Sequence, residues 1–329
     1  MGPRLHELRF RFQARYRVVW FALAALLIVA ALTEGATFHG PSVNLITALA
    51  GVLAIAAAGQ LLVVMSGGID LSVPAVMALG GAVVVKQTQG ADDELALALV
   101  EAIGLAAAIG LVNGLLVAVA RLNALIVTLA MNGIVAGAIL WWTQGTFSTS
   151  GEVPPALADF TAGGIGSVNV LGLVGLALLI VLGLVIRCTA PGRSFVAMGT
   201  NRAAAEIVGV RVRAYEVAGY VIAAVLYVSA GILLAGMIEI PNTTIGDPYL
   251  LSTIVAVALG GAALSGGPSS MVCTAAGCLF LAILDQYLTL RDFGAGIQDL
   301  ANGIALAAAV AIVTLGSGGG RRLRAILGK

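Results

Sequence analysis

Long apolar runs constrain this chain more than any other feature of its sequence. Hydrophobic residues make up 60% of the 329 residues and charged residues only 10%, whereas soluble domains carry about 25% charged residues. A helix needs about 20 mostly apolar residues to cross the hydrocarbon core of a bilayer. We therefore predict an all-α polytopic membrane protein with about ten transmembrane helices, at 18–35, 43–64, 71–88, 95–119, 123–142, 170–188, 215–238, 249–264, 268–290 and 297–315.

The distribution of basic residues predicts which side of the membrane each loop occupies. In this ten-helix arrangement, every Lys and Arg except Lys86 and Arg291 falls on one side. Cytoplasmic loops carry an excess of Lys and Arg, so both termini and the central segment 191–213 are predicted to be cytosolic. The alternative is that the arginine-rich start and the first apolar run form a secretory signal peptide, which would make the number of helices odd.

The polar loops are too short to form a soluble domain. We predict one transmembrane domain over 1–329, with residues 18–315 embedded in the membrane. The three cysteines are expected to pack in or beside apolar runs, and His6 and His39 have no companion ligands, so no metal site is predicted. A Gly-x-x-x-x-Gly-Lys-Ser/Thr phosphate loop is missing from the sequence. We find no catalytic constellation, and any ATP must be hydrolysed on another subunit.

The central segment 191–213 is a polar and basic stretch in an otherwise apolar chain. Residues 191–192 are expected to stop the preceding helix, and Gly199–Asn201 to form a turn. The alanine-rich run Arg202–Val208 then predicts a short cytosolic helix that ends at Gly209. A short helix with small exposed residues can dock closely into a groove of another protein. The alternative is an ordinary amphipathic cytosolic loop.

Two glycine pairs interrupt the apolar runs, at Gly67–Gly68 and at Gly260–Gly261. The first pair breaks a helix, and Asp70 and Ser72 are expected to cap the next helix, which Pro74 helps to start. Discontinuous helices mark the binding site in many transporters, so both breaks are candidates for the translocation path or its gate. The alternative is a pair of tight turns whose glycines serve helix packing.

Polar side chains inside the apolar runs would be costly to expose to lipid, so we expect them to face other helices or a cavity. Gln60 and Asn132 are the preferred candidates for lining a path, ahead of Asn113 and Asn302. Asp285 and Glu101 lie near the predicted outer ends and are expected to be solvated. The spacings Gly104-x-x-x-Ala108 and Gly110-x-x-x-Gly114 predict close helix packing.

Two strings resemble the ribose-type sugar permeases of ATP-binding-cassette (ABC) importers. Residues 198–205, Met-Gly-Thr-Asn-Arg-Ala-Ala-Ala, followed by Gly209, resemble their Gly-x-Asn-x-x-Ala-Ala-x-x-x-Gly coupling motif, and Ala203 replaces the Glu of ABC importers in general. Residues 66–74, Ser-Gly-Gly-Ile-Asp-Leu-Ser-Val-Pro, resemble the motif Thr-Gly-Gly-Ile-Asp-Leu-Ser-Val-Gly. The resemblance extends over residues 45–312.

This resemblance implies the permease subunit of a binding-protein-dependent importer in the bacterial inner membrane. It implies an ABC ATPase pair that holds ATP-Mg, a soluble substrate-binding protein, and a second permease copy or paralogue. The chain itself is expected to bind no cofactor and no nucleic acid. Residues implied in ATPase coupling are Arg193, Gly199, Asn201, Arg202, Ala204, Ala205, Glu206 and Gly209. Residues expected at the translocation path or gate are Gln60, Gly67, Gly68, Asp70, Ser72, Asn132, Gly260 and Gly261.

The small number of charges within the apolar runs favours a neutral substrate. Carriers driven by protons or sodium commonly use an acidic residue deep in a helix, and the sequence places none there convincingly. We therefore expect a monosaccharide, such as a ribose-like pentose or a related sugar. A nucleoside, a signalling furanose, a branched-chain amino acid or another small polar solute is the alternative, and a secondary carrier that runs without ATP is a further one.

Overall fold

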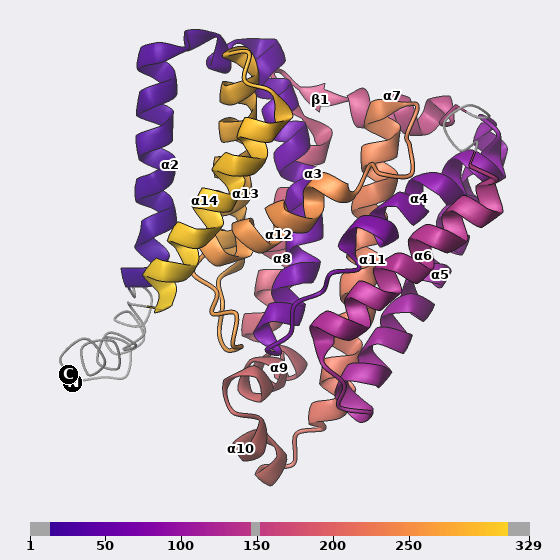
Figure 1. The fold of residues 1–329 in the computed structure, drawn as a ribbon, viewed down its shortest axis with the longest axis vertical. Helices are drawn as coiled ribbons and strands as arrows, with labels where there is room; N and C mark the ends of the chain where they lie inside the picture. Colours follow the sequence, from indigo (N-terminus) through magenta and orange to yellow (C-terminus); the bar gives the residue numbers. More distant parts are fainter. Residues whose placement is uncertain (1–13, 146–151, 315–329) are drawn as a thin grey trace.

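The computed structural model describes residues 14–145 and 152–314, and most of them are helical (Figure 1). The predicted cytosolic placement of the two termini concerns residues 1–13 and 315–329, which lie outside the described residues. In chain order the elements are α2 (Ala14–Thr33), the 3₁₀ turn η1 (Gly35–Phe38), α3 (Gly40–Met65), α4 (Val73–Thr88), the 3₁₀ turn η2 (Asp92–Glu94), α5 (Leu95–Gly114), the π-turn η3 (Leu115–Val119), α6 (Ala124–Thr143), α7 (Pro155–Ala162), β1 (Gly164–Ile165), β2 (Val168–Asn169), α8 (Val170–Cys188), α9 (Ala190–Thr200), α10 (Arg202–Ile207), α11 (Val212–Ile238), α12 (Asp247–Leu259), α13 (Met271–Leu290) and α14 (Ala295–Thr314).

Among the described residues, seven helical segments are long and apolar enough to cross a membrane, and three further apolar helices are shorter. The shorter helices, Val73–Thr88, Asp247–Leu259 and Gly296–Ala311, occupy the predicted runs 71–88, 249–264 and 297–315. At about 1.5 Å per residue, the 16 residues of α4 and the 13 residues of α12 span less than the roughly 30 Å hydrocarbon core. The chain is therefore a multi-pass membrane protein in which two central helices are partial spans.

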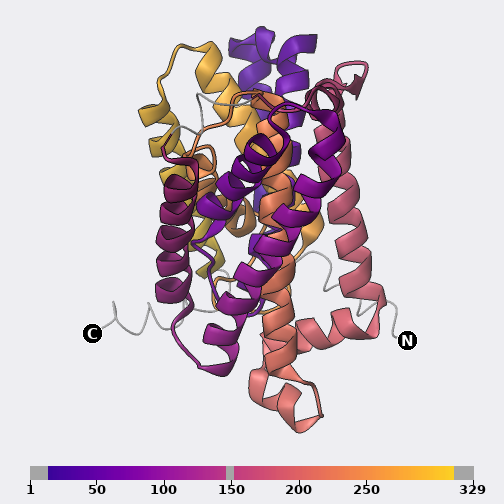
Figure 2. The ribbon, with the colours of Figure 1, turned by 90° about the vertical axis from the view of Figure 1, so that its right-hand side faces the viewer.

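Helices α9 and α10 form a separate layer at one end of the bundle. Figure 2 shows α9 lying across the lower end of the long helices, with α10 projecting beyond it. The described start of α2 and the described end of α14 lie toward the same side of the bundle (Figure 1). The opposite side carries α7 and the two-stranded antiparallel hairpin β1–β2.

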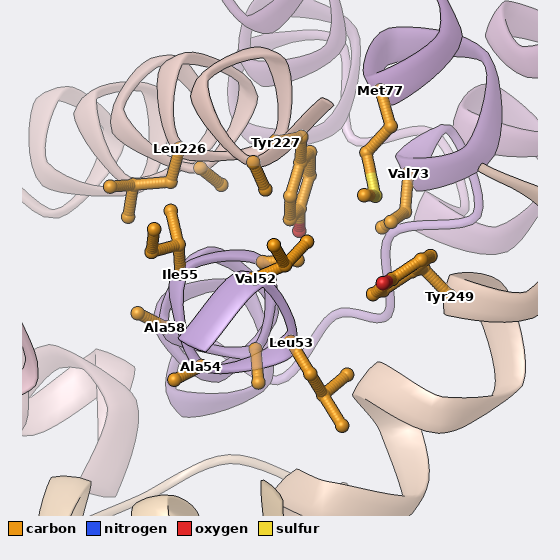
Figure 3. Close-up of a cluster of buried hydrophobic side chains, with 14 of the residues drawn as sticks. Val52, Leu53, Ala54, Ile55, Ala58, Val73, Met77, Leu226, Tyr227 and Tyr249 are labelled. Carbon is orange, nitrogen blue, oxygen red and sulfur yellow. The ribbon is translucent and has the colours of Figure 1, made fainter. Parts of the chain in front are cut away.

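Helix α3 forms the centre of the fold. It packs against α8, α11, α12 and α13, and every residue from 51 to 65 is buried. Figure 3 shows Tyr227 of α11 pointing toward Val52 of α3, with Met77 of α4 and Tyr249 of α12 beside them. A helix that is apolar on all faces is suited to complete burial, so this part of α3 is enclosed by the other helices.

The predicted outer loop after α6 contains structure of its own. Helix α7 and the hairpin fill its described part, and Asn169 fixes them to the bundle. The amide of Asn169 donates to Thr47 Oγ1 of α3 at 2.9 Å, and its side chain donates to the Thr161 carbonyl oxygen at 3.0 Å. Its Oδ1 also accepts from the Leu171 amide at 2.8 Å and so caps α8. The loop is thereby a small cover attached to the central helix.

The two glycine spacings predicted on α5 have different surroundings. A Cβ added to Gly110 or Gly114 would lie 2.6 or 2.8 Å from backbone atoms of α11, so this pair does allow close packing. Gly104 has nothing within 4 Å of such an added atom, and both Gly104 and Ala108 are exposed. The prediction of close packing is therefore wrong for Gly104-x-x-x-Ala108 within this chain, because that face of α5 points away from the bundle.

Alanine substitution on α5 tests this packing. Gly110→Ala should lower the free energy of unfolding by about 1–3 kcal/mol, because the new methyl group must displace the α11 backbone. Gly104→Ala is the matched control on the same helix and should be neutral or stabilising by about 0.5–1 kcal/mol. Thermal unfolding of the detergent-purified protein measures both, and equal shifts for the two variants would contradict the observed packing.

Candidate functional site

The first helix break lies between α3 and α4. Helix α3 ends at Met65, residues 66–72 are non-helical, and α4 begins at Val73. Figure 1 shows this segment leaving the lower end of α3 and climbing to the middle of the bundle, where α4 begins. Non-helical backbone at membrane depth is tolerated only where protein or a cavity satisfies its polar groups. The partners of this segment therefore define what the break can do.

Helix α6 supplies two of these partners. Thr128 Oγ1 accepts from the Leu71 amide at 2.9 Å, and Asn132 Oδ1 accepts from the Ala75 amide at 3.1 Å. Asn132, a predicted path residue, thus caps α4 from a neighbouring helix. Sequence reasoning missed Thr128, although it lies four residues before Asn132 and so on the same face of α6.

Asp70 and Ser72 form hydrogen bonds with each other within the break. Asp70 is 1% exposed, and its Oδ1 accepts from both the amide and the hydroxyl of Ser72. Asn113 of α5 donates to the same hydroxyl at 3.2 Å. The prediction that Asp70 and Ser72 cap α4 is wrong: Ser72 occupies the N-cap position without a side-chain capping bond. The Asp70 oxygen instead accepts from the amide two residues further along the chain and so forms an Asx turn. The residue that caps α4 is Asn132 of α6.

Gln60 connects two central helices. It is completely buried on α3, and its Oε1 accepts from the Tyr227 hydroxyl of α11 at 3.0 Å. In this conformation Gln60 Oε1, Asp70 Oδ1 and Asn132 Oδ1 each accept a hydrogen bond, whereas Gln60 Nε2 is buried without a partner among the described residues. Their role along a translocation path stays a prediction.

The second helix break lies between α12 and α13. A Cβ added to Gly260 would lie 2.8 Å from the Thr274 amide nitrogen, so this glycine lets α12 end directly against α13. Gly261 follows with a φ of 82° as the chain leaves the helix. The chain then runs to Ser270, whose hydroxyl accepts from the Cys273 amide at 3.3 Å and caps α13. The predicted glycine pair therefore both ends a helix and serves packing.

The two breaks meet the end of α9 at the carbonyl oxygen of Met65. The Gly267 amide donates to this oxygen at 3.1 Å. Gly199, in the last turn of α9, lies so close that an added Cβ would be 2.0 Å from the same oxygen. A Cβ on Gly266 would in turn lie 3.2 Å from the Gly67 Cα. These five residues form a junction that joins a predicted gate residue, Gly67, to a predicted coupling residue, Gly199.

Helix α9 differs from the sequence prediction. Gly199 was expected in a turn, but it lies in the last turn of α9, where its missing side chain permits the close approach to α3. The helix is capped by Thr189, whose Oγ1 accepts from the Gly192 amide at 3.1 Å. Arg193 is exposed and donates to the Cys188 carbonyl oxygen at 3.1 Å. Phe195 anchors the other face of α9 against α11, where Gly219 makes room for its ring.

Helix α10 is the short helix expected after Arg202. Asn201 caps it, with its Oδ1 accepting from the Ala204 amide at 3.0 Å. Arg202 Nη2 lies 2.7 Å from a carboxylate oxygen of Glu216 on α11, whose side chain is only 7% exposed. Sequence reasoning missed Glu216; the signal for it was an isolated acidic residue at the start of an apolar helix, close to a basic segment.

The tip of α10 faces away from the bundle. Ala205 is buried, whereas Ala204 and Glu206 are exposed. Ile207 and Val208 are 86% and 77% exposed, and the sequence analysis did not single them out. Gly209 has a φ of 84°, a conformation that favours glycine, and it turns the chain back toward α11. Two exposed branched residues beside alanines form an apolar tip at the end of this layer.

Comparison with known proteins gives one family for most of the chain. Residues 42–315 match the family described as branched-chain amino acid transport system / permease component. The chain is 34% identical over 268 residues to the ribose import permease protein RbsC of Escherichia coli (strain K12), covering 79% of this chain and 82% of the relative. It is 32% identical over 289 residues to the autoinducer 2 import system permease protein LsrC of Klebsiella pneumoniae, covering 87% and 83%. No solved structure matches the chain.

Hydrogen exchange can test the junction. Gly199→Ala places a methyl group 2.0 Å from the Met65 oxygen, so it should displace this carbonyl and weaken its bond from Gly267. A local loss of about 1.4 kcal/mol would raise exchange about tenfold. We expect faster exchange in peptides covering 66–72 and 262–270, measured by mass spectrometry. Gly133→Ala on α6 has open space around it and is the control; unchanged exchange in both peptides of Gly199→Ala would refute the junction.

Proposed function

This chain belongs to the family of branched-chain amino acid transport system permease components, and we propose that it is the membrane-spanning subunit of an ATP-driven importer for a sugar-like solute. The observation that carries the mechanism is the junction at Met65. It connects the layer formed by α9 and α10 directly to the two helix breaks where α3 ends. A partner that moves this layer can therefore move both breaks.

The apolar tip of α10 is the proposed contact with an ABC ATPase. Ile207 and Val208 expose branched side chains with no cover from the described part of the chain. Ala204 and Glu206 are exposed beside them, while Arg202 is held by Glu216 and so braces the helix. An apolar tip on a braced helix fits a groove in a partner protein. ATP-Mg would bind to the ATPase, and this chain would bind no cofactor.

The proposed cycle is a two-state switch driven from outside the membrane. Closure of the ATPase pair presses on α10 and α9, and Gly199 passes the displacement to the Met65 carbonyl. The segments 66–72 and 260–270 then shift together and exchange inward access for outward access. ATP binding supplies the bias between the two states, because a partner shifts an equilibrium only by its differential affinity for them.

The proposed substrate is a neutral polyol, most simply a ribose-like pentose or a related sugar. RbsC and LsrC are named for import of ribose and of autoinducer 2. The buried Asp70 is satisfied by Ser72, and the buried Glu216 pairs with Arg202. Hydroxyl groups can exchange hydrogen bonds with residues such as Gln60 and Asn132 without a counter-charge, so a neutral solute suits this interior.

The remaining partners follow from this function. We place the protein in a bacterial inner membrane, with the layer of α9 and α10 and both termini in the cytosol. A soluble binding protein would deliver substrate to the opposite face, where α7 and the hairpin lie. A second permease, either another copy or a paralogue, would complete the translocation unit.

Substitution at the tip of α10 tests the proposed coupling. Ala204→Phe should lower ATP-dependent uptake at least tenfold and reduce copurification of the ATPase, because the exposed ring blocks close docking. The fold should survive, since Ala204 makes no buried contact. Ala108→Phe, at an exposed position on α5, is the control and should keep uptake and copurification near wild type. Wild-type uptake by Ala204→Phe would contradict the proposed docking.

The source of energy separates the importer from a secondary carrier. Cells depleted of ATP but holding their ion gradients should lose uptake of the substrate. The control is a proton-coupled carrier measured in the same cells, which should continue to work. Uptake that persists without ATP would reject the importer and favour the carrier.

A further inference from the structure

A groove of about 550 Å³ runs along the outside of the bundle between η3 and the first turns of α11. Its lining is apolar except at one end. The residues lining it are Leu115, Val119, Arg213, Ala214, Val217, Ala218, Val221 and Ile222. In a membrane protein an apolar groove of this kind faces acyl chains, and its single charged residue is the unusual feature.

Small residues and the π-turn create the groove. Ala214 and Ala218 lie one turn apart on α11 and leave a hollow along the exposed side of the helix. The opposite wall is η3, where the π-turn widens the helix and offsets Leu115 and Val119. These two side chains are 45% and 49% exposed, so the groove is open along its length.

Arg213 lies at the end of the groove nearest α10. Its side chain is exposed, and among the described residues it takes part in no ion pair, whereas Arg202 and Arg291 both do. From Arg213 to Ile222 the helix rises about 14 Å, which matches roughly half of the hydrocarbon core. The groove thus begins at a cation near the membrane surface and continues as an apolar channel into one leaflet.

We propose that this groove binds one anionic phospholipid. The phosphate would sit on the Arg213 guanidinium, which matches phosphate geometry with paired N–H donors. One acyl chain would lie over Ala214 and Ala218 toward Ile222. Basic pockets between helices near the membrane surface select anionic head groups in this way. Because Glu216 lies one turn along α11 from Arg213, the lipid would hold the same part of α11 that braces α10.

Native mass spectrometry tests the lipid site. The protein is purified from its membrane in gentle detergent with the subunits it retains, and phosphatidylglycerol or phosphatidylcholine with identical acyl chains is titrated in. Wild type should retain one phosphatidylglycerol in preference to phosphatidylcholine. Arg213→Gln should weaken phosphatidylglycerol retention about tenfold, the scale of a lost hydrogen bond to a charged group. Arg211→Gln removes an exposed arginine that does not line the groove and should change retention less than twofold.

A second pair of variants tests the apolar part of the groove. Ala218→Leu fills the hollow and should reduce retention of both lipids, while Ala108→Leu, exposed on α5 but outside the groove, should not. Equal losses for Arg213→Gln and Arg211→Gln would overturn the proposal, since any surface cation would then act alike. If the Ala218→Leu variant shifted from dimer to monomer mass and its lipid retention stayed unchanged, this result would also overturn the proposal and would assign the groove to a protein contact.

Discussion

A helix that breaks inside a bilayer leaves backbone groups that no water can satisfy, and this constraint organises the structure. At the break after α3, Thr128 and Asn132 of α6 accept hydrogen bonds from the amides of Leu71 and Ala75. The Met65 carbonyl oxygen accepts a hydrogen bond from the amide of Gly267 in the other break. Since each unsatisfied group would cost several kcal/mol in hydrocarbon, the two breaks and α6 must move as a set or exchange partners together.

The junction is the proposed route by which a displacement of α9 would reach the two helix breaks. Two packed backbones with no side chain between them cannot absorb a displacement by changing rotamers, and Gly199 brings α9 directly against the Met65 carbonyl. The other face of α9 rests on α11 through Phe195, so α9 is held between α3 and α11. In the proposed mechanism, a displacement of the exposed layer would therefore reach the backbone of both helix breaks where α3 ends. Such close-packed contacts favour discrete states over gradual deformation.

The sequence predicted the class of fold because apolar length is a local property. It also placed both helix breaks and α10, since glycine pairs, Asn201 and Gly209 are local signals. It could not show that Gly67 and Gly199 lie in one junction, because contacts between residues far apart depend on how the helices pack. The capping role predicted for Asp70 was wrong for the same reason. The residue that caps α4 is Asn132 of α6, which lies 57 residues away from Ala75 in the sequence.

Ala203 changes the chemistry of the proposed docking of α10. A glutamate at this position would have added a charge to the tip, but the structure instead presents Ala204, Ile207 and Val208 to the outside. Arg202, the basic residue of α10, pairs with the buried Glu216 and stays 41% exposed, with its Nε 3.9 Å from Glu206. The proposed docking would therefore combine burial of apolar area, which gains about 25 cal/mol per Å² and is little affected by salt, with the charge of the exposed Glu206. In the proposed mechanism, the pair of Arg202 and Glu216 holds α10 on α11 while the partner presses on the tip.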